Sequence, residues 1–225
     1  MKSKIIKLFL LCLLLASCTK GTLSNNDQQT DIERLISGNE RFINGKSIHK
    51  NQTLLRVKEI KDTQKPFAII VSCSDSRVSP EIVFDQGLGD LFIIRTAGNV
   101  LHDYELGSIE YAVEHLNVKT IYVMGHTNCG AVKAMLGEDN GHPVPGHIHS
   151  IIEGLKNEPE IQAAIKNKAQ SKNITEDAVE ANVKFAINQI RTSEPILKEK
   201  FNKKETQIFG GIYNLENGKI KQLTN

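Results

Sequence analysis

One stretch of the chain, residues 67–77, constrains the fold more than any other. Five apolar residues, from Phe67 to Val71, run without interruption into a small polar turn. A short apolar run that ends in polar turn residues is typical of a buried strand in a parallel sheet. Open α/β sheets bind their ligands at the carboxyl ends of such strands. The turn carries a thiol, a carboxylate and a guanidinium at alternate positions, namely Cys73, Asp75 and Arg77.

A second stretch repeats this pattern further along the chain. Residues 120–125 are typical of another buried strand, and His126 and Cys129 follow it. Two strands of one parallel sheet would bring Cys73, His126 and Cys129 to a common edge. Thiolates and imidazoles are zinc ligands, and structural zinc sites normally have four protein ligands. We therefore expect a zinc site whose fourth position is taken either by a water molecule or by Asp75.

Other interpretations of these residues remain open. Cys73 and Cys129 are the two cysteines outside the first 18 residues, and in an oxidising compartment such a pair often forms a disulfide. The spacing of His126 from Cys129 favours metal binding instead. Asp75 and Arg77 are close enough to form a bidentate ion pair, which would hold the carboxylate off the metal. The alternative is a solvated surface pair worth about 0–1 kcal/mol.

The rest of the chain alternates helices and strands, which predicts an α/β fold with a mostly parallel central sheet flanked by helices. Thr30 and Glu33 form a capping-box pattern that begins the first helix. We expect a single domain over residues 30–225, because the length suits one core and no internal linker is evident. The expected helices are residues 30–45, 54–60, 80–84, one that Asp103 or Ser108 caps, 131–136, 148–169 and 175–192. The expected strands are 67–72, 91–94, 120–125, 207–213 and 219–223, the last two joined by a hairpin turn around Asn217-Gly218.

The first 29 residues differ from the rest. Three lysines and a short apolar run, residues 8–15, are typical of an export signal rather than a membrane span. The sequence Leu15-Ala-Ser-Cys18 resembles a bacterial lipobox. It predicts a signal peptide over residues 1–17, a lipid on Cys18 and a polar tether over residues 18–29. The alternative is a general secretory signal in which Cys18 has no role.

These features predict where the protein resides and what it contacts. We expect an exported protein that its lipid holds to the bacterial cell envelope, on the periplasmic face or the cell surface. The chain has 28 basic and 26 acidic side chains and no basic block. Nucleic-acid binding requires clustered positive charge, so we expect no nucleic-acid partner and no membrane contact except through the lipid.

The two motifs together resemble a known family. Cys-x-Asp-Ser-Arg followed by His-x-x-Cys, with 52 residues between Cys73 and His126, is similar to the β-class carbonic anhydrases. The resemblance extends from about Ile32 to Leu223. It implies a β-carbonic-anhydrase-like fold, one Zn²⁺ per subunit, a homodimer or higher homo-oligomer, and reversible hydration of carbon dioxide to bicarbonate by attack of a zinc hydroxide. It also implies that Asp75 and Arg77 are catalytic, with Asp75 as the fourth zinc ligand in a closed state.

The same resemblance assigns residues outside the motifs. Gln64 matches a glutamine that reaches the substrate across the dimer interface in plant-type members. Phe92 and Tyr111 match an aromatic pair that lines the pocket, and Gly98 falls in the loop beside it. His115 matches a histidine proposed as a proton shuttle. From the residues alone, Phe92 and Tyr111 would be ordinary core and His115 a solvated helix residue.

Two rival functions accompany this prediction. A family relative that hydrolyses carbon disulfide or carbonyl sulfide would use the same hydroxide, and a panel of substrates separates the two. A noncatalytic zinc-binding lipoprotein, such as a zinc store, is disfavoured because all five motif residues are present. Measurable hydration of carbon dioxide would exclude it.

Overall fold

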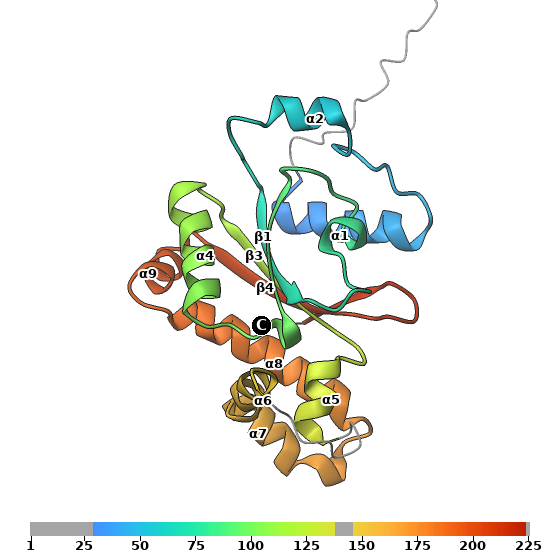
Figure 1. Ribbon diagram of the computed structural model, residues 1–225, viewed down its shortest axis with the longest axis vertical. Helices are drawn as coiled ribbons and strands as arrows, with labels where there is room; N and C mark the ends of the chain where they lie inside the picture. Colours follow the sequence, from blue (N-terminus) through green and yellow to red (C-terminus); the bar gives the residue numbers. More distant parts are fainter. Residues whose placement is uncertain (1–28, 138–145, 224–225) are drawn as a thin grey trace, which may run out of the picture.

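A five-stranded sheet, in the order β2-β1-β3-β4-β5, forms the centre of the computed structural model, which describes residues 29–137 and 146–223 (Figure 1). Four strands are parallel and β5 is antiparallel to β4. The predicted α/β fold with a mostly parallel sheet is therefore confirmed. The predicted signal peptide, Cys18 and the tether as far as residue 28 lie outside the described residues. The strands are β1 (Ala68–Cys73), β2 (Leu91–Thr96), β3 (Thr120–His126), β4 (Gln207–Tyr213) and β5 (Ile220–Leu223).

Helices lie on both faces of this sheet (Figure 1). None of the helices in the described part of the chain has the length and apolar character needed to cross a membrane. Their bounds are α1 (Asp31–Ile43), α2 (Leu54–Glu59), α3 (Pro80–Val83), α4 (Asp103–His115), α5 (Gly130–Leu136), α6 (Ile148–Lys156), α7 (Pro159–Lys166), α8 (Ile174–Thr192) and α9 (Ile196–Asn202), with short 3₁₀ helices η2 (Ala97–Asn99) and η3 (Lys168–Gln170).

The two faces of the sheet have separate apolar cores. On one face, Leu35 of α1 packs in a cluster with Ile70 and Tyr122 of the central strands. On the other face, α4, α8 and α9 contribute a second cluster, and α5, α6 and α7 gather at one end of the sheet (Figure 1). Strands β1 and β3 are buried along their whole length. Burial on both faces explains why their sequences are uninterrupted apolar runs rather than alternating ones.

Local signals at helix ends were partly predictive. The capping box between Thr30 and Glu33 is present, since Thr30 accepts from the Glu33 N–H and the Glu33 carboxylate accepts from the Thr30 N–H. The predicted capping residue of α4 was wrong. His102 is the N-cap, and its N–H donates to the Glu105 side chain at 2.9 Å, so neither Asp103 nor Ser108 has that role.

Two further expectations are corrected by the structure. Residues 148–169 do not form one helix, because α6 ends at Lys156 and α7 begins at Pro159. Proline has no N–H to continue a helix but fits the first turn of a new one. The predicted β4–β5 hairpin is present and β4 ends at Tyr213 as expected, but β5 begins at Ile220, one residue after the expected start.

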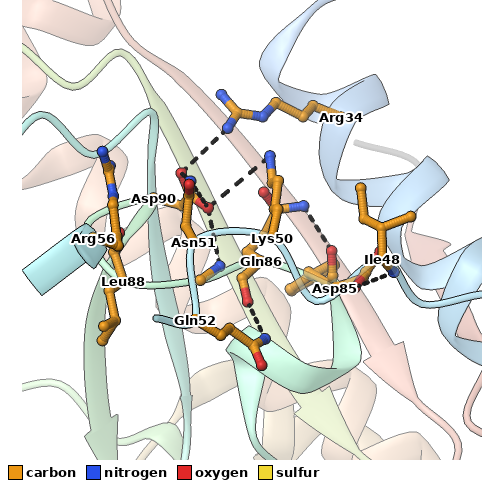
Figure 2. A network of polar contacts seen from close by, with 12 residues as sticks. Arg34, Ile48, Lys50, Asn51, Gln52, Arg56, Asp85, Gln86, Leu88 and Asp90 are labelled. Atoms are coloured by element: carbon orange, nitrogen blue, oxygen red, sulfur yellow. Dashed lines mark hydrogen bonds and ion pairs between the residues drawn. The ribbon is translucent and has the colours of Figure 1, made fainter. Parts of the chain in front are cut away.

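Two buried carboxylates, Asp85 and Asp90, bind the segment before α2 to the chain that leads into β2 (Figure 2). Asp90 accepts a hydrogen bond from Asn51 Nδ2 at 2.9 Å and pairs with Arg34 at 3.4 Å. Asp85 pairs with Arg41 Nε at 2.6 Å and also accepts two backbone N–H groups. Buried carboxylates are stable only when such partners replace water. The network therefore holds the start of the edge strand β2 in place.

Candidate metal centre

Three candidate ligands meet at the carboxyl end of the sheet. Cys73 is the last residue of β1 and His126 the last of β3, and these two strands pair in parallel. Cys129 is the N-cap of α5. The ligand atoms of the three residues lie within 4.8 Å of one another, and all three residues are buried. The fold therefore brings together the three residues that the two motifs predicted.

The imidazole of His126 is oriented to bind a cation through Nε2. Its Nδ1 lies 2.9 Å from the carbonyl oxygen of Thr127. Because that oxygen can only accept, Nδ1 carries the proton and Nε2 presents a lone pair. Nε2 is buried and has no hydrogen-bond partner among the described residues. A buried polar atom without a hydrogen-bond partner lowers the stability of a protein by about 1–3 kcal/mol, and a bound cation would remove this cost.

The two sulfurs complete a donor set that fits zinc. The hydrogen bond from Cys129 lowers the pKa of Cys73, and the same contact raises the pKa of Cys129. Gly98 N–H also donates to Cys73 Sγ at 3.3 Å. Both cysteines are free thiols in the structure, not a disulfide. Two thiolates and one imidazole are typical zinc ligands, and they leave a fourth position open.

Arg77 holds the carboxylate of Asp75 beside this cluster. Its Nε donates to Oδ1 at 2.9 Å, its Nη2 to Oδ2 at 2.8 Å, and its backbone N–H to Oδ1 at 2.9 Å. The predicted bidentate bridge is therefore present. The side-chain bonds from Arg77 hold the pKa of Asp75 well below its usual range, so Asp75 is ionised at neutral pH and acts only as an acceptor. Its Oδ2 lies 3.9 Å from His126 Nε2.

Arg95 also supports the site, although it was not among the residues predicted from the sequence. It lies near the carboxyl end of β2, opposite Ser72 in the strand register. Its Nε donates to the carbonyl of Cys73 at 3.1 Å and its Nη2 to the carbonyl of Asp75 at 2.8 Å. These bonds hold the backbone on both sides of the polar turn. The available signal was an arginine that directly follows the apolar run of a predicted strand.

The aromatic residues predicted for the pocket lie away from the cluster within one chain. In the pairing of β1 with β2, Phe92 lies opposite Ile69 and Thr96 lies opposite Cys73. Phe92 is therefore four residues, or about 13 Å along the strand, from the residue that faces Cys73. Its ring centroid lies 6.4 Å from that of Tyr111, and Tyr111 lies 5.1 Å from His115. These three side chains form a group of their own beside the edge strand.

Gln64 also lies away from the metal ligands. It is exposed and precedes the amino end of β1, whereas Cys73 ends that strand. Of the predicted residues outside the two motifs, Gly98 is the one that contacts a ligand atom. The roles predicted for Gln64, Phe92 and Tyr111 therefore depend on a second subunit, and they stay predictions.

A mostly parallel α/β fold that gathers two cysteines, a histidine and an arginine-held aspartate at its strand ends defines a metalloprotein suited to zinc. Residues 68–220 match the family model described as carbonic anhydrase. The chain belongs to the carbonic anhydrase family.

Individual relatives agree with this family. The carbonic anhydrase of Mycolicibacterium smegmatis is 36% identical over 200 residues, which cover 88% of this chain and 95% of that protein. Carbonic anhydrase 2 of Mycobacterium tuberculosis is 49% identical over 120 residues, which cover 53% of this chain and 58% of that protein.

Solved structures place the chain in the β class. The β-carbonic anhydrase CcaA has a TM-score of 0.66 and 26% identity, and the match covers 86% of this chain and 95% of that one. The Coccomyxa β-carbonic anhydrase, solved with acetazolamide, has a TM-score of 0.65 and 26% identity, and the match covers 88% of each chain.

Proposed function

We propose that this protein is a zinc-dependent β-carbonic anhydrase that hydrates carbon dioxide reversibly to bicarbonate and a proton. The observation that carries the proposal is the buried cluster of Cys73, His126 and Cys129 beside a carboxylate that Arg77 holds. Zinc bound there would act as a Lewis acid that lowers the pKa of a water in its open position, though less than it would with three neutral imidazoles. The carbonic anhydrases of M. smegmatis and M. tuberculosis support the substrate.

The chain's own residues have distinct roles in this proposal. Asp75 is ionised and accepts a hydrogen bond, so it orients the nucleophile and does not protonate it. Arg77 holds that carboxylate in one orientation with two parallel hydrogen bonds. Gly98 donates to the sulfur of Cys73 and so stabilises the thiolate that a metal requires.

We also propose a homo-oligomer that completes the pocket. The outer edge of β2 has no partner strand in the described sheet, and Tyr104 and Tyr111 on α4 are 88% and 48% exposed. An open strand edge beside exposed aromatic side chains is typical of a protein interface. A second subunit on this side would supply the partner subunit's Gln64 as a hydrogen-bond donor to bicarbonate and would enclose Phe92 and Tyr111.

The N-terminal region supports a separate proposal about location. We propose that Cys18 is lipidated after removal of residues 1–17 and that the protein is held to the bacterial cell envelope, on the periplasmic face or the cell surface. The support is the sequence Leu15-Ala-Ser-Cys18 after a short apolar run. One acyl chain binds a membrane weakly, whereas two or more anchor a protein stably.

A stopped-flow assay of carbon dioxide hydration tests the proposed activity. The zinc-loaded protein should be active, with a rate that rises with pH above roughly 7, and His126→Ala should be inactive. Carbon disulfide and carbonyl sulfide should be poor substrates in the same assay series. A fully zinc-loaded protein that hydrates no carbon dioxide would refute the proposal, and turnover of carbonyl sulfide alone would favour the rival hydrolase.

A further inference from the structure

Asn182 is a buried polar residue on the apolar face of α8, and its amide contacts the loop beside the metal ligands. It is 2% exposed. Its Nδ2 donates to the carbonyl of Gly98 at 2.7 Å, and its Oδ1 accepts from Asn99 Nδ2 at 3.4 Å. Both hydrogen-bonding ends of the amide are therefore used on two adjacent residues of one loop.

This loop has an unusual backbone conformation that needs support. Gly98 and Asn99 are both in the left-handed region, with φ of 66° and 47°. Glycine adopts this region freely, but a second left-handed residue directly after it is less favourable. The space around Gly98 is also limited, because a Cβ there would lie 3.0 Å from Ala131 Cβ and 3.3 Å from Leu155. The loop is held between Asn182 on one helix and the start of α5 on another.

The loop conformation has a direct consequence at Cys73. The N–H of Gly98 donates to Cys73 Sγ at 3.3 Å, and its direction depends on the backbone angles that Asn182 maintains. A hydrogen bond to a ligand sulfur fixes the direction of the sulfur and reduces its negative charge. Groups that support metal ligands in this way commonly change metal affinity by about 10–100-fold when they are removed.

We propose that Asn182 is a positioning residue for the zinc site: it holds the Gly98–Asn99 loop so that the Gly98 N–H is directed at the sulfur of Cys73. Asn182 contacts no candidate ligand atom itself and acts through the loop. The inference rests on the proposed function in one respect, which is that Cys73, His126 and Cys129 bind zinc.

The test measures metal binding in the full chain rather than catalysis. Asn182→Ala removes both hydrogen bonds, and Asn182→Asp keeps the acceptor for Asn99 but replaces the donor to Gly98. Zinc affinity is measured by competition with a chromophoric chelator. Both variants should bind zinc about 10–100-fold more weakly than wild type. In the Co²⁺-substituted protein their thiolate-to-metal charge-transfer band should move to longer wavelength, because a sulfur without its N–H bond donates charge more readily.

Gln189→Ala is the matched control. Gln189 lies on the same helix and donates from Nε2 to the carbonyl of Leu101 at 3.2 Å, so it supports the same segment without contacting Gly98. This variant should melt at a lower temperature but keep the zinc affinity and the Co²⁺ band of the wild type. If Asn182 had a purely structural role, all three variants would melt at a lower temperature but keep the zinc affinity and the Co²⁺ band of the wild type.

Each remaining outcome is decisive. Wild-type affinity and an unshifted band in both Asn182 variants would overturn the inference. If Asn182→Ala does not fold, Asn182→Asp decides alone; if neither folds while Gln189→Ala does, Asn182 belongs to the core and the inference fails. A wild-type protein that binds no zinc would instead refute the proposed function.

Discussion

Removing one metal ligand in His126→Ala should abolish the stability that zinc adds to the fold. Without zinc, the variant loses a fully buried side chain, a kind of change that costs about 2–5 kcal/mol in protein cores. It also removes the buried Nε2 that lacks a partner among the described residues, which offsets about 1–3 kcal/mol. The metal-free variant should therefore fold, with a stability lower by about 1–2 kcal/mol, the difference between these two effects at their lower and upper ends.

The effect of zinc on the wild type is larger. The three ligand atoms already lie within 4.8 Å of one another, so binding needs little rearrangement. Zinc at a thousand times its dissociation constant stabilises a protein by about 4 kcal/mol. For a chain of this size, each kcal/mol raises the melting temperature by about 2–4 °C. Wild-type Tm should therefore rise by about 8–16 °C with zinc relative to the same protein in a chelator.

Differential scanning calorimetry of both proteins, each with zinc and with chelator, makes the comparison. His126→Ala should show a small zinc-dependent rise in Tm or none, and its zinc content after gel filtration should fall with it. His149→Ala is the matched control, because His149 is an exposed histidine on α6 and its removal should leave the full rise. A zinc-dependent rise in His126→Ala equal to that of the wild type would show that His126 is not a ligand.

Three other predictions address the carboxylate, the pH response and the N-terminus. Arg77→Ala should keep its zinc and lose most carbon dioxide hydration, because Asp75 without its partner is free to turn to the metal. Full activity in this variant would contradict the prediction. Lys203→Ala removes an exposed ion pair with Glu199 and should behave as wild type. Burial, with the nearby charge of Glu160, raises the pKa of Glu158 to about 9 from 4.5. The folded state therefore loses stability as pH rises between these values. In urea unfolding, Glu158→Gln should be more stable than the wild type at pH 9 and equally stable at pH 4. A stability difference that does not change with pH would refute the raised pKa of Glu158. Cys18→Ser should leave the membrane fraction or accumulate as precursor, and a processed variant that stays membrane-bound would contradict lipidation.

The sequence by itself determined the class of fold and the three candidate metal ligands. Apolar runs that end in polar turns encode strands buried on both faces, and the carboxyl ends of parallel strands meet at one edge. Cys73 and His126 could be placed there because each follows such a run directly. The bridge between Asp75 and Arg77 was predictable for a similar reason, since two residues in one turn interact whatever the rest of the chain does.

Only the tertiary structure decided which distant residues support that cluster. The bond from Arg95 to the Cys73 carbonyl joins residues 22 apart in sequence, and the bond from Asn182 to Gly98 joins residues 84 apart. Such contacts depend on strand register and on how α8 packs against the sheet. Hydrophobic periodicity in the sequence specifies neither the register nor the packing. The family resemblance assigned Phe92 and Gln64 to the pocket. Within one chain, Phe92 lies four residues from the one that faces Cys73, and Gln64 precedes β1, so their roles depend on a second subunit and stay predictions. Local patterns specify elements and their ends, and packing alone sets the distances between side chains on different elements.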